Sequence, residues 1–414
     1  MNFVLRHPFS EEVADSITRL NLPERFDIAS PSVRQTDIEL LSVAPPGFMD
    51  ITHFDTVRFP PPNWALQRFA EAAGDGSLAY SNYRGNKDVL EKVAENVSRF
   101  LGVSVDPKRN IILTPGTQSA LFGVLSARVN PGQRVAVMDP DYLFTARILR
   151  FLGAEVGYVP LSLTNGRYEP DLDMLELEFA KNNAQHLVFS HPNNPTGAVY
   201  SKEILNAIGE LAIRYGVSIC VDELYSRLVY DSTEFNHLAA QDGLFEQTAT
   251  LLGPSKTESM SGYRLGVVVG DEKLMQAVEN ILSITSLRAP AYAQHILPYW
   301  LAKDGEWLQS LLHDFKGLRE LTISAMTSLA WLKVHPQQGT AYLWLDVSAL
   351  GLPGAVVARA LLEKAGVLVS PGYQFGPKSD GHFRVCYARD EKHWPEALDR
   401  IVRVLGDLAK RQGL

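Results

Sequence analysis

The chain has few cysteines and no long apolar run. Only two of its 414 residues are cysteine, Cys220 and Cys386, and each lies in an apolar, strand-like run where a thiol behaves as a small hydrophobic side chain. Neither spacing resembles a metal site, so we expect no bound metal. No run approaches the roughly 20 apolar residues of a membrane span, and the amino terminus lacks a secretory pattern. We therefore expect a cytoplasmic protein in a reducing compartment, with no membrane partner.

The chain also lacks an excess of basic residues. It has 39 Lys and Arg against 47 Asp and Glu, which gives a formal net charge of -8. Such a chain has no general attraction for phosphate backbones or anionic lipids, so we expect no nucleic acid partner. A composition of 46% hydrophobic and 21% charged residues is that of a globular protein, and the length allows two domains with a large buried core.

Alternating helical and strand periodicities in the middle of the chain predict an α/β domain. Seven β-rich segments separated by amphipathic helices indicate a mostly parallel seven-stranded sheet between helices. They are 110–113, 134–138, 155–159, 186–189, 217–221, 247–252 and 265–269. The tail mixes strands with a closing helix and predicts a smaller α+β domain. We therefore divide the chain into an N-terminal arm at 1–50 packing on the small domain, a large domain at 51–290 and a small domain at 291–414.

A glycine turn follows the first predicted strand. The segment Ile-Ile-Leu-Thr-Pro-Gly-Thr-Gln-Ser-Ala-Leu (111–121) is typical of a strand, a turn and the start of a helix. This arrangement leaves the amides of Gly116, Thr117 and Gln118 free at the positive end of a helix, which is a geometry that binds phosphate. On its own such a segment is more often an ordinary strand-to-helix turn.

Further polar residues follow later strands. Tyr142 comes after the strand at 134–138, Asn194 lies in His-Pro-Asn-Asn-Pro-Thr-Gly, and Asp222 and Tyr225 lie in Val-Asp-Glu-Leu-Tyr. Parallel strands place ligands at their carboxyl ends, where a tyrosine could stack on a flat heterocycle and a carboxylate could keep a ring nitrogen protonated. Taken singly, each residue is more often a packing residue, a cap or half of an ion pair. Their common placement at strand ends is what favours a site.

The most informative stretch is Leu-Leu-Gly-Pro-Ser-Lys-Thr-Glu-Ser-Met-Ser-Gly-Tyr-Arg-Leu-Gly (251–266). The amine of Lys256, once deprotonated, can form a Schiff base, and the guanidinium of Arg264 can bind a phosphate bidentately. These are two needs of an enzyme that carries pyridoxal phosphate.

In these motifs, and over nearly its whole length from about residue 50, the chain resembles the class I/II aminotransferases, which are fold-type I pyridoxal-phosphate enzymes. The resemblance implies an aminotransferase that moves an amino group between an L-amino acid and a 2-oxo acid through a Schiff base on Lys256. It also implies pyridoxal 5'-phosphate as the cofactor and a homodimer with shared active sites.

The same resemblance assigns roles to single residues. Lys256, Asp222 and Tyr225 are the catalytic set, with Asp222 as the partner of the pyridinium nitrogen. Tyr225 and Asn194 hydrogen-bond the cofactor's 3-oxygen, and Tyr142 stacks on its ring. The residues that fall where the family binds phosphate are Gly116, Thr117, Gln118, Ser255 and Arg264.

Two further assignments concern the substrate and the second subunit. Arg384, in Gly-His-Phe-Arg-Val-Cys-Tyr-Ala, matches the arginine that clamps the substrate's α-carboxylate, and Asn194 is also expected to bind the substrate. Tyr80 matches a tyrosine that crosses a dimer interface to the phosphate of the neighbouring subunit.

Two positions depart from the family pattern. Gly253 stands where many members carry a serine hydroxyl for the phosphate, so that contact must come from Ser255, a backbone amide or water. Asp55 stands in Asp-Ile-Thr-His-Phe-Asp-Thr-Val-Arg-Phe-Pro-Pro-Pro (50–62), where a small glycine is usual in a segment that lines the substrate pocket. One hypothesis is that Asp55 favours a substrate with a cationic side chain. The alternative is that it points into a turn or pairs with Arg58.

Two other functions stay open at this point. A lyase, cyclase or synthase that uses elimination or replacement chemistry would share the cofactor and the same lysine, because the first proton abstraction is common to all of them. A ligand-sensing regulator on the same fold would add a basic DNA-binding module in front, whereas only about fifty non-basic residues precede the match.

Overall fold

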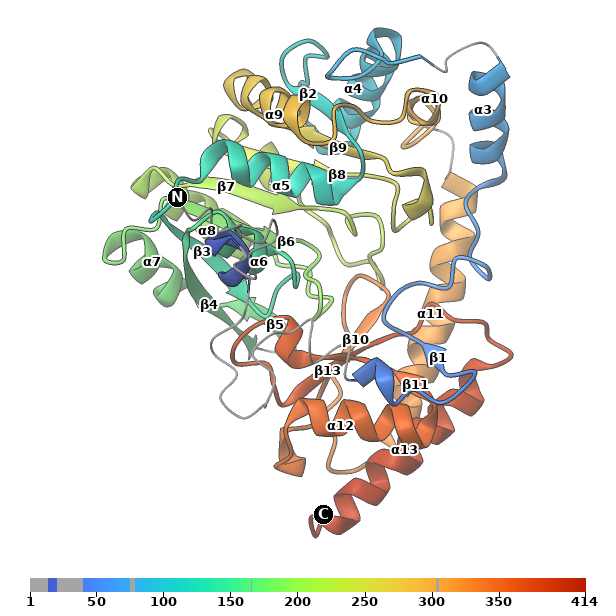
Figure 1. The fold of residues 1–414 in the computed structure, drawn as a ribbon. Helices are drawn as coiled ribbons and strands as arrows, with labels where there is room; N and C mark the ends of the chain where they lie inside the picture. Colours follow the sequence, from blue (N-terminus) through green and yellow to red (C-terminus); the bar gives the residue numbers. More distant parts are fainter. Residues whose placement is uncertain (1–13, 21–39, 75–78, 165, 303–304) are drawn as a thin grey trace, which may run out of the picture.

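Strands of β-branched and other apolar residues form a large sheet with helices on both faces, above a smaller sheet with helices of its own (Figure 1). The computed structural model describes residues 14–20, 40–74, 79–164, 166–302 and 305–414. It confirms the predicted fold class, a large mostly parallel sheet domain with a smaller α+β domain.

The large sheet has eight strands. Their spatial order is β2 (Ile111–Thr114), β9 (Gly266–Val269), β8 (Thr248–Leu252), β7 (Ser218–Asp222), β6 (His186–Ser190), β3 (Arg134–Asp139), β4 (Glu155–Thr164) and β5 (Arg167–Pro170). The neighbours from β8 to β4 pair in parallel, whereas β2, β9 and β5 pair antiparallel. All seven predicted segments are strands of this sheet. The eighth strand, β5, was missed because Arg-Tyr-Glu-Pro carries no apolar run and forms only as the returning arm of a hairpin with β4.

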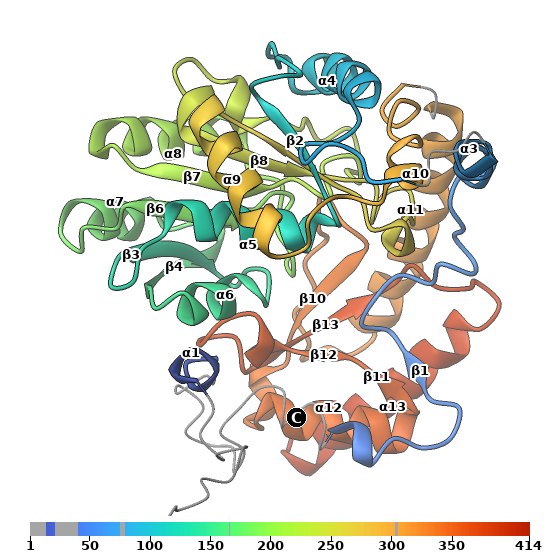
Figure 2. The same cartoon turned by 45° about the horizontal axis from the view of Figure 1, so that its top comes forward.

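Helices cover both faces of this sheet because its buried strands are apolar on both sides. In β3, Val135 and Val137 pack on one face with α5 (Thr117–Arg128) and α9 (Glu272–Ile284). Ala136 and Met138 pack on the other face with α7 (Leu172–Ala180) and α8 (Lys202–Tyr215). The two layers are visible in Figures 1 and 2.

Two of the amphipathic helices beside these strands are α4 (Lys87–Leu101) and α8. Asn86 caps α4 by accepting from the amide of Asp88, and Ser201 caps α8 by accepting from the amide of Ile204. Gly216 ends α8 in the left-handed conformation, with φ 67°.

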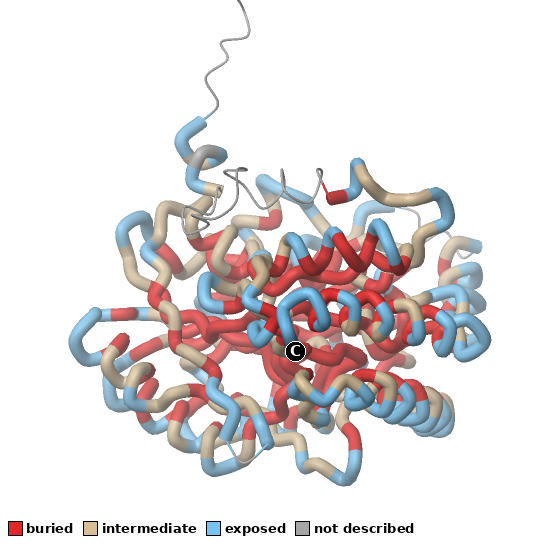
Figure 3. The backbone as a smooth tube through the Cα atoms, turned by 90° about the horizontal axis from the view of Figure 1, so that it is seen from below, coloured by how far each residue is buried: buried red, intermediate tan, exposed pale blue. Residues whose placement is uncertain are grey.

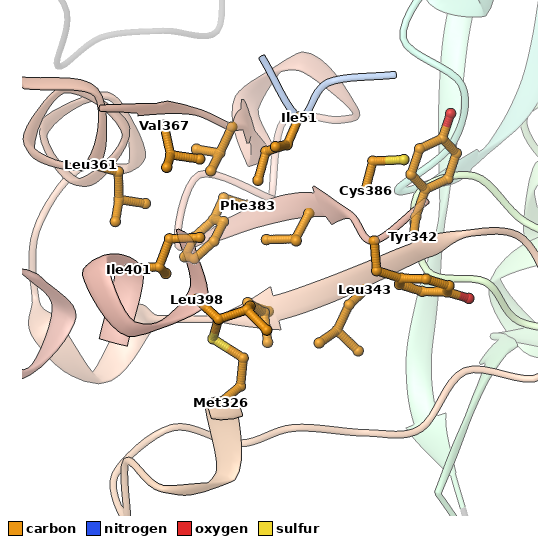
Figure 4. Close-up of a cluster of buried hydrophobic side chains, with 14 of the residues drawn as sticks. Ile51, Met326, Tyr342, Leu343, Leu361, Val367, Phe383, Cys386, Leu398 and Ile401 are labelled. Carbon is orange, nitrogen blue, oxygen red and sulfur yellow. The ribbon is translucent and has the colours of Figure 1, made fainter. Parts of the chain in front are cut away.

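The small sheet consists of β10 (Tyr342–Asp346), β13 (His382–Cys386) and β12 (Ser370–Pro371), all antiparallel. A separate parallel pair joins β1 (Met49–Asp50) to β11 (Val367–Leu368). Packed against them are α11 (Gly305–Thr327), α12 (Gly354–Ala360) and α13 (Trp394–Arg411). Their shared core is drawn in Figure 4, and in Figure 3 the buried backbone lies at the centre of the molecule with exposed segments around it.

The hydrophobic cores divide the chain at slightly different places from those expected. Phe54 and Phe59 belong to the core of the small sheet, although we placed the start of the large domain at residue 51. Residues 289–300, including Ala293 in α10 (Ala291–Gln294) and Trp300, pack with α4 in a core of the large sheet. The bounds differ because we set them where the sequence periodicity changes, whereas apolar side chains pack into whichever core is nearest.

The described parts of the predicted N-terminal arm contact both domains, one part packing on the small sheet and the other on the large sheet. Residues 40–50 lie on the small sheet, where Leu40 joins the core and β1 pairs with β11. Residues 14–20 differ from the expectation, because Arg19 next to α1 (Asp15–Thr18) donates to the carbonyls of Arg150 and Phe151 at 3.1 and 3.3 Å. Those carbonyls end α6 (Thr145–Phe151) on the large sheet. Residues 1–13 and 21–39 of the arm lie outside the described residues.

Within the described ranges, no helix is long and apolar enough to cross a membrane. The same ranges contain no group of three or more His, Cys, Asp and Glu side chains arranged to hold a metal ion.

Candidate active site

A cavity of about 450 Å³ opens where the strands of the large sheet end. Nine of the predicted site residues line it: Thr117, Gln118, Tyr142, Asn194, Asp222, Tyr225, Ser255, Lys256 and Arg264. They come from five separate segments of the chain, which lie at or after the ends of β2, β3, β6, β7 and β8. The expectation that the strand ends gather these side chains is therefore met by the geometry.

One end of the cavity is rich in donors. Gly116 precedes α5 with φ 87°, and a Cβ built on it would collide with the guanidinium of Arg264. Arg264 itself adopts a left-handed φ of 55° and donates to the carbonyl of Ser261 at 2.9 Å. The hydroxyl of Thr117 is buried without a hydrogen-bond partner among the described residues. A helix start, a guanidinium and an unused hydroxyl together can hold a phosphate.

Ser255 and Gly253 flank this end. Ser255 is buried and lines the cavity, and its hydroxyl lies 3.5 Å from the carbonyl of Leu265. A Cβ at Gly253 would lie 3.0 Å from the hydroxyl oxygen of Thr117. A side chain at position 253 would thus be crowded by the hydroxyl of Thr117.

A carboxylate marks another wall of the cavity. Asp222 ends β7, and its Oδ1 accepts from the amide of Leu224 at 3.1 Å. Burial raises the pKa of Asp222 to about 6, while the hydrogen bond from Leu224 and the positive charge of Lys256 oppose that shift. Lys256 follows β8, and its Nζ lies 5.8 Å from the centre of the Phe54 ring. An amine and an acid therefore face one enclosed space.

A network of buried hydrogen bonds holds Asn194 in place. Its amide donates to the hydroxyl of Ser190 at 2.9 Å. Beneath it, Asp141 accepts from the amide of Ser190 and from the side chain of Asn193, both at 3.0 Å. Burial raises the pKa of Asp141 to about 8, and the amide donors oppose that shift. The Asn-rich turn is thus fixed by side chains rather than by a regular element.

Tyr142 forms an aromatic wall. Its hydroxyl donates to Oε1 of Gln118 at 2.9 Å, and its amide donates to Asp141 at 2.6 Å. The ring packs edge-on against Phe144, with centroids 5.5 Å apart. With both ends of the side chain fixed, the ring is a rigid surface on which a planar group can stack.

Arg384 lies next to the cavity on β13. Its Nη1 donates to Oδ1 of Asn194 at 2.7 Å, and its Nη2 donates to the carbonyl of Thr52 at 2.6 Å and the hydroxyl of Ser370 at 3.1 Å. Its Nε is buried without a partner among the described residues. The guanidinium carbon lies 3.9 Å from the ring centre of Tyr342 and 4.9 Å from that of Phe375. Arg384 is therefore an oriented cation: the three hydrogen bonds above use three of its five N–H donors and leave two for a carboxylate.

Of the four predicted residues that do not line the cavity, Gly116 and Arg384 lie beside it, and the other two are Tyr80 and Asp55. Tyr80 is 81% exposed, and Arg288 lies over its ring at 4.8 Å. Asp55 faces a turn, where its Oδ1 accepts from the amides of Val57 and Arg58 at 3.0 and 3.1 Å. The side chain of Arg58 pairs with Glu391 and Asp314 rather than with Asp55. The structure thus gives Asp55 the turn role that the sequence left as an alternative.

Several residues around the cavity were missed by sequence reasoning. Ser190, Phe144, Leu121, Leu224 and Ser261 line it, and Tyr342 and Phe54 support it from the small sheet. Ser190 could have been found, because it ends β6 directly before the Asn-rich turn. Tyr342 and Phe54 carry no local signal, since only the packing of the two sheets brings them to the site.

Comparison with known proteins identifies a family resemblance along most of the chain. The profile described as Aminotransferase class I and II matches residues 52–401. An aspartate/prephenate aminotransferase of Thermus thermophilus is 30% identical over 351 residues, covering 84% of this chain and 89% of that protein. An arginine–pyruvate transaminase of Pseudomonas aeruginosa is 29% identical over 372 residues, covering 90% of this chain and 91% of that protein.

Solved structures are similar to the same extent. The crystal structure of an aspartate aminotransferase from Rhodobacter sphaeroides superposes with a TM-score of 0.84 at 33% identity. The match covers 91% of this chain and 99% of that one.

Proposed function

This chain belongs to the class I and II aminotransferase family, and from that premise we propose that the cavity at the end of the large sheet is its active site. The protein is a pyridoxal-phosphate-dependent aminotransferase, which transfers an amino group between an amino acid and a 2-oxo acid. The alternative of a lyase, cyclase or synthase is not favoured, because the similar proteins named above are aminotransferases.

The residues present fit pyridoxal phosphate. Its phosphate matches the end of the cavity where the α5 amides, the unpartnered hydroxyl of Thr117 and Arg264 converge. Its ring fits beside Tyr142, and its ring nitrogen matches the half-buried carboxylate of Asp222. When bound, the cofactor supplies an aldehyde that condenses with amines and a ring that accepts electrons from the substrate.

Lys256 is proposed as the residue that holds the cofactor covalently and moves the substrate proton. Its amine lines the cavity with one face against the ring of Phe54, so it reaches the space in front of Tyr225 and Asn194. When an incoming amine displaces it, Nζ becomes the base that takes the proton from the substrate α-carbon.

Arg384 and Asn194 are proposed to position the substrate. The hydrogen bond between them holds the guanidinium of Arg384, beside the cavity, against the side-chain amide of Asn194, which lines it. A carboxylate bound there fixes which substrate bond lies within reach of Lys256, so the pair contributes orientation as well as affinity.

The observation that carries the proposal is the meeting of Lys256, Asp222 and Arg264 in one cavity. The test is borohydride reduction of the protein loaded with pyridoxal phosphate, followed by peptide mapping. We expect the label on Lys256 alone, and none on a Lys256→Ala variant. Lys273→Ala, on the exposed side of α9, is the control and should be labelled like the wild type. A label elsewhere would contradict the assignment.

The same preparation tests the reaction class. With an amino acid substrate, transamination yields a 2-oxo acid and the pyridoxamine form of the cofactor, without ammonia. Release of free ammonia with an unchanged cofactor would instead indicate elimination.

We also propose a homodimer in which Tyr80 of each subunit reaches the phosphate end of the other. Tyr80 is 81% exposed. The guanidinium of Arg288, which packs over the Tyr80 ring, also packs over the ring of Tyr83, with its carbon 4.2 Å from that ring centre. A groove of about 610 Å³ runs from Thr56 and Leu66 to Arg264 at the edge of the cavity. Sedimentation of the wild type should give a dimer. The Tyr80→Phe variant should bind the cofactor more weakly and should remain a dimer.

A cytoplasmic location is supported by the two cysteines. Cys220 and Cys386 are both buried free thiols, which need no oxidising compartment. Cell fractionation would test this location.

A further inference from the structure

Resting on the proposed function, we propose that Tyr342 is a positioning residue for two parts of the site at once. Its hydroxyl orients the phenol of Tyr225, and its ring supports the guanidinium of Arg384. Tyr342 does not line the cavity, and it lies on β10 of the small sheet, at the edge of the core cluster drawn in Figure 4.

The hydroxyl argument starts from a hydrogen bond between two phenols. The hydroxyl oxygens of Tyr225 and Tyr342 lie 3.0 Å apart, and both side chains are buried. Among the described residues, Tyr225 is the only hydrogen-bond partner of the Tyr342 hydroxyl. When Tyr342 donates, the oxygen of Tyr225 accepts and its own proton points away, toward the cavity that Tyr225 lines. Tyr225 is then set as a donor to the 3-oxygen of the cofactor.

Accepting that bond also makes Tyr225 a stronger donor. Consecutive hydrogen bonds polarise one another in a buried, weakly screened environment. A stronger donor stabilises the ionised form of the cofactor's 3-oxygen and lowers the pKa of the bound cofactor. The Tyr342 hydroxyl should therefore act on the cofactor without touching it.

The ring argument concerns Arg384. Its guanidinium carbon lies 3.9 Å from the centre of the Tyr342 ring, with Phe375 at 4.9 Å. A guanidinium packed on aromatic faces keeps its plane fixed while its edges stay free to donate. The same side chain thus holds the cofactor donor by its hydroxyl and the substrate anchor by its ring.

The tyrosine is itself held firmly. Its ring packs against Phe54 at 5.7 Å and Tyr225 at 5.7 Å, and its amide donates to the hydroxyl of Thr340 at 3.2 Å. It pairs with Cys386 across β13, two residues from Arg384. Because Tyr342 is itself fixed, it can fix the positions of the side chains that it contacts, Tyr225 and Arg384.

Two substitutions separate the two roles. Tyr342→Phe keeps the ring and removes the hydroxyl, so we expect an unchanged KM and a kcat lowered about fivefold to tenfold. The visible absorption of the bound cofactor, titrated against pH, should shift its midpoint upward by about 0.3 unit or more. Tyr342→Leu removes the ring as well, so KM for the amino acid should rise about tenfold or more.

The matched control is Tyr230→Phe. Tyr230 is also buried in the core of the small sheet, but the partners of its hydroxyl among the described residues are the carbonyl of Thr340 at 2.6 Å and the hydroxyl of Tyr387 rather than Tyr225. Its loss should lower the melting temperature without moving the midpoint of the cofactor's titration. An equal shift in Tyr230→Phe and Tyr342→Phe would show a general structural effect and overturn the proposal.

Tyr225→Phe distinguishes this proposal from the function on which it rests. If Tyr225→Phe moves the midpoint and Tyr342→Phe leaves it unchanged, the positioning role fails and the proposed site stands. If Tyr225→Phe also leaves it unchanged, Tyr225 does not contact the cofactor, and both the positioning role of Tyr342 and the assignment of Tyr225 are wrong, whereas the labelling of Lys256 still tests the proposed site. A shift in both variants, larger for Tyr225→Phe, supports the proposal.

Discussion

Arg384 and Asn194 are joined by a hydrogen bond of 2.7 Å that crosses from the small sheet to the large one. Arg384 lies on β13, whereas Asn194 lies in the turn after β6, 190 residues away in the sequence. The proposed substrate anchor and the proposed cofactor pocket therefore share one contact. Any shift between the two sheets would change both.

Replacing Arg384 by lysine should reduce kcat/KM by about a hundredfold or more, because an ammonium cannot reproduce the planar fork that binds a carboxylate while holding Asn194. The loss should appear in both KM and kcat, since orientation is lost with affinity. Steady-state kinetics with a good amino donor measure both. Arg359→Lys, an exposed change on α12 that keeps its ion partner Glu363, should leave them unaltered. Near-normal kinetics for Arg384→Lys would contradict the assignment.

The affinity of the cofactor-free protein for pyridoxal phosphate should fall in mild acid. Burial raises the pKa of Asp222 to about 6, so this carboxylate is charged above that pH and takes up a proton below it. Binding a protonated ring nitrogen requires the charged form. Below pH 6 the carboxyl group of Asp222 must therefore lose its proton before the cofactor binds. The apparent Kd should rise by up to about tenfold per pH unit.

The measurement is a fluorescence titration with pyridoxal phosphate at several pH values. Asp222→Asn serves as the control, because it keeps the shape and removes the titrating group. Its affinity should be weaker and should retain only the pH dependence of the cofactor itself. Identical pH profiles for the two proteins would exclude Asp222 as the partner of the ring nitrogen.

Alanine at Gly116 should disable the proposed phosphate end. The added Cβ would collide with the guanidinium of Arg264, and the φ of 87° would strain any side chain. A charge-assisted hydrogen bond is worth roughly 1.5–3 kcal/mol, so displacing Arg264 should weaken pyridoxal phosphate binding about tenfold or more. Gly132→Ala is the matched control, since Gly132 has a φ of 79° with open space around it. It should lower stability but not cofactor affinity.

Removal of the Asp55 side chain should affect stability rather than specificity. Its carboxylate accepts from two turn amides, and losing such a cap costs about 1 kcal/mol in the free energy of unfolding. Asp55→Asn keeps an acceptor oxygen and should lose less than Asp55→Ala, which denaturant melts would measure. The ratio of arginine to aspartate turnover should be the same in both variants and in the wild type. A lower ratio in Asp55→Asn would restore the hypothesis of a cationic substrate.

The large sheet could be predicted from the sequence because its strands and turns are specified by local residue patterns. Each strand is a short apolar run, and the residues at its carboxyl end must emerge at one edge once the strands are parallel. The gathering of the cavity residues from Thr117 to Arg264 at this edge was therefore predictable. The hairpin strand β5 was not, because its residues have no apolar pattern and depend on pairing with β4.

The support of the site was not predictable for a different reason. Tyr342 and Phe54 reach it only through the packing of the small sheet against the large one, which no local pattern specifies. Asp55 shows the opposite case. A departure at one aligned position suggested a role in binding, whereas in the structure Oδ1 of its carboxylate accepts two hydrogen bonds from its own turn.

The short link between Asp222 and Tyr225 has a thermodynamic consequence. Asp222 ends a strand of the large sheet, and Tyr225 already belongs to the core of the small one, together with Leu228 and Tyr230. Unfolding of either domain would disrupt packing in the other. Calorimetry should therefore record a single endotherm in which the large-sheet and small-sheet domains unfold as one cooperative unit.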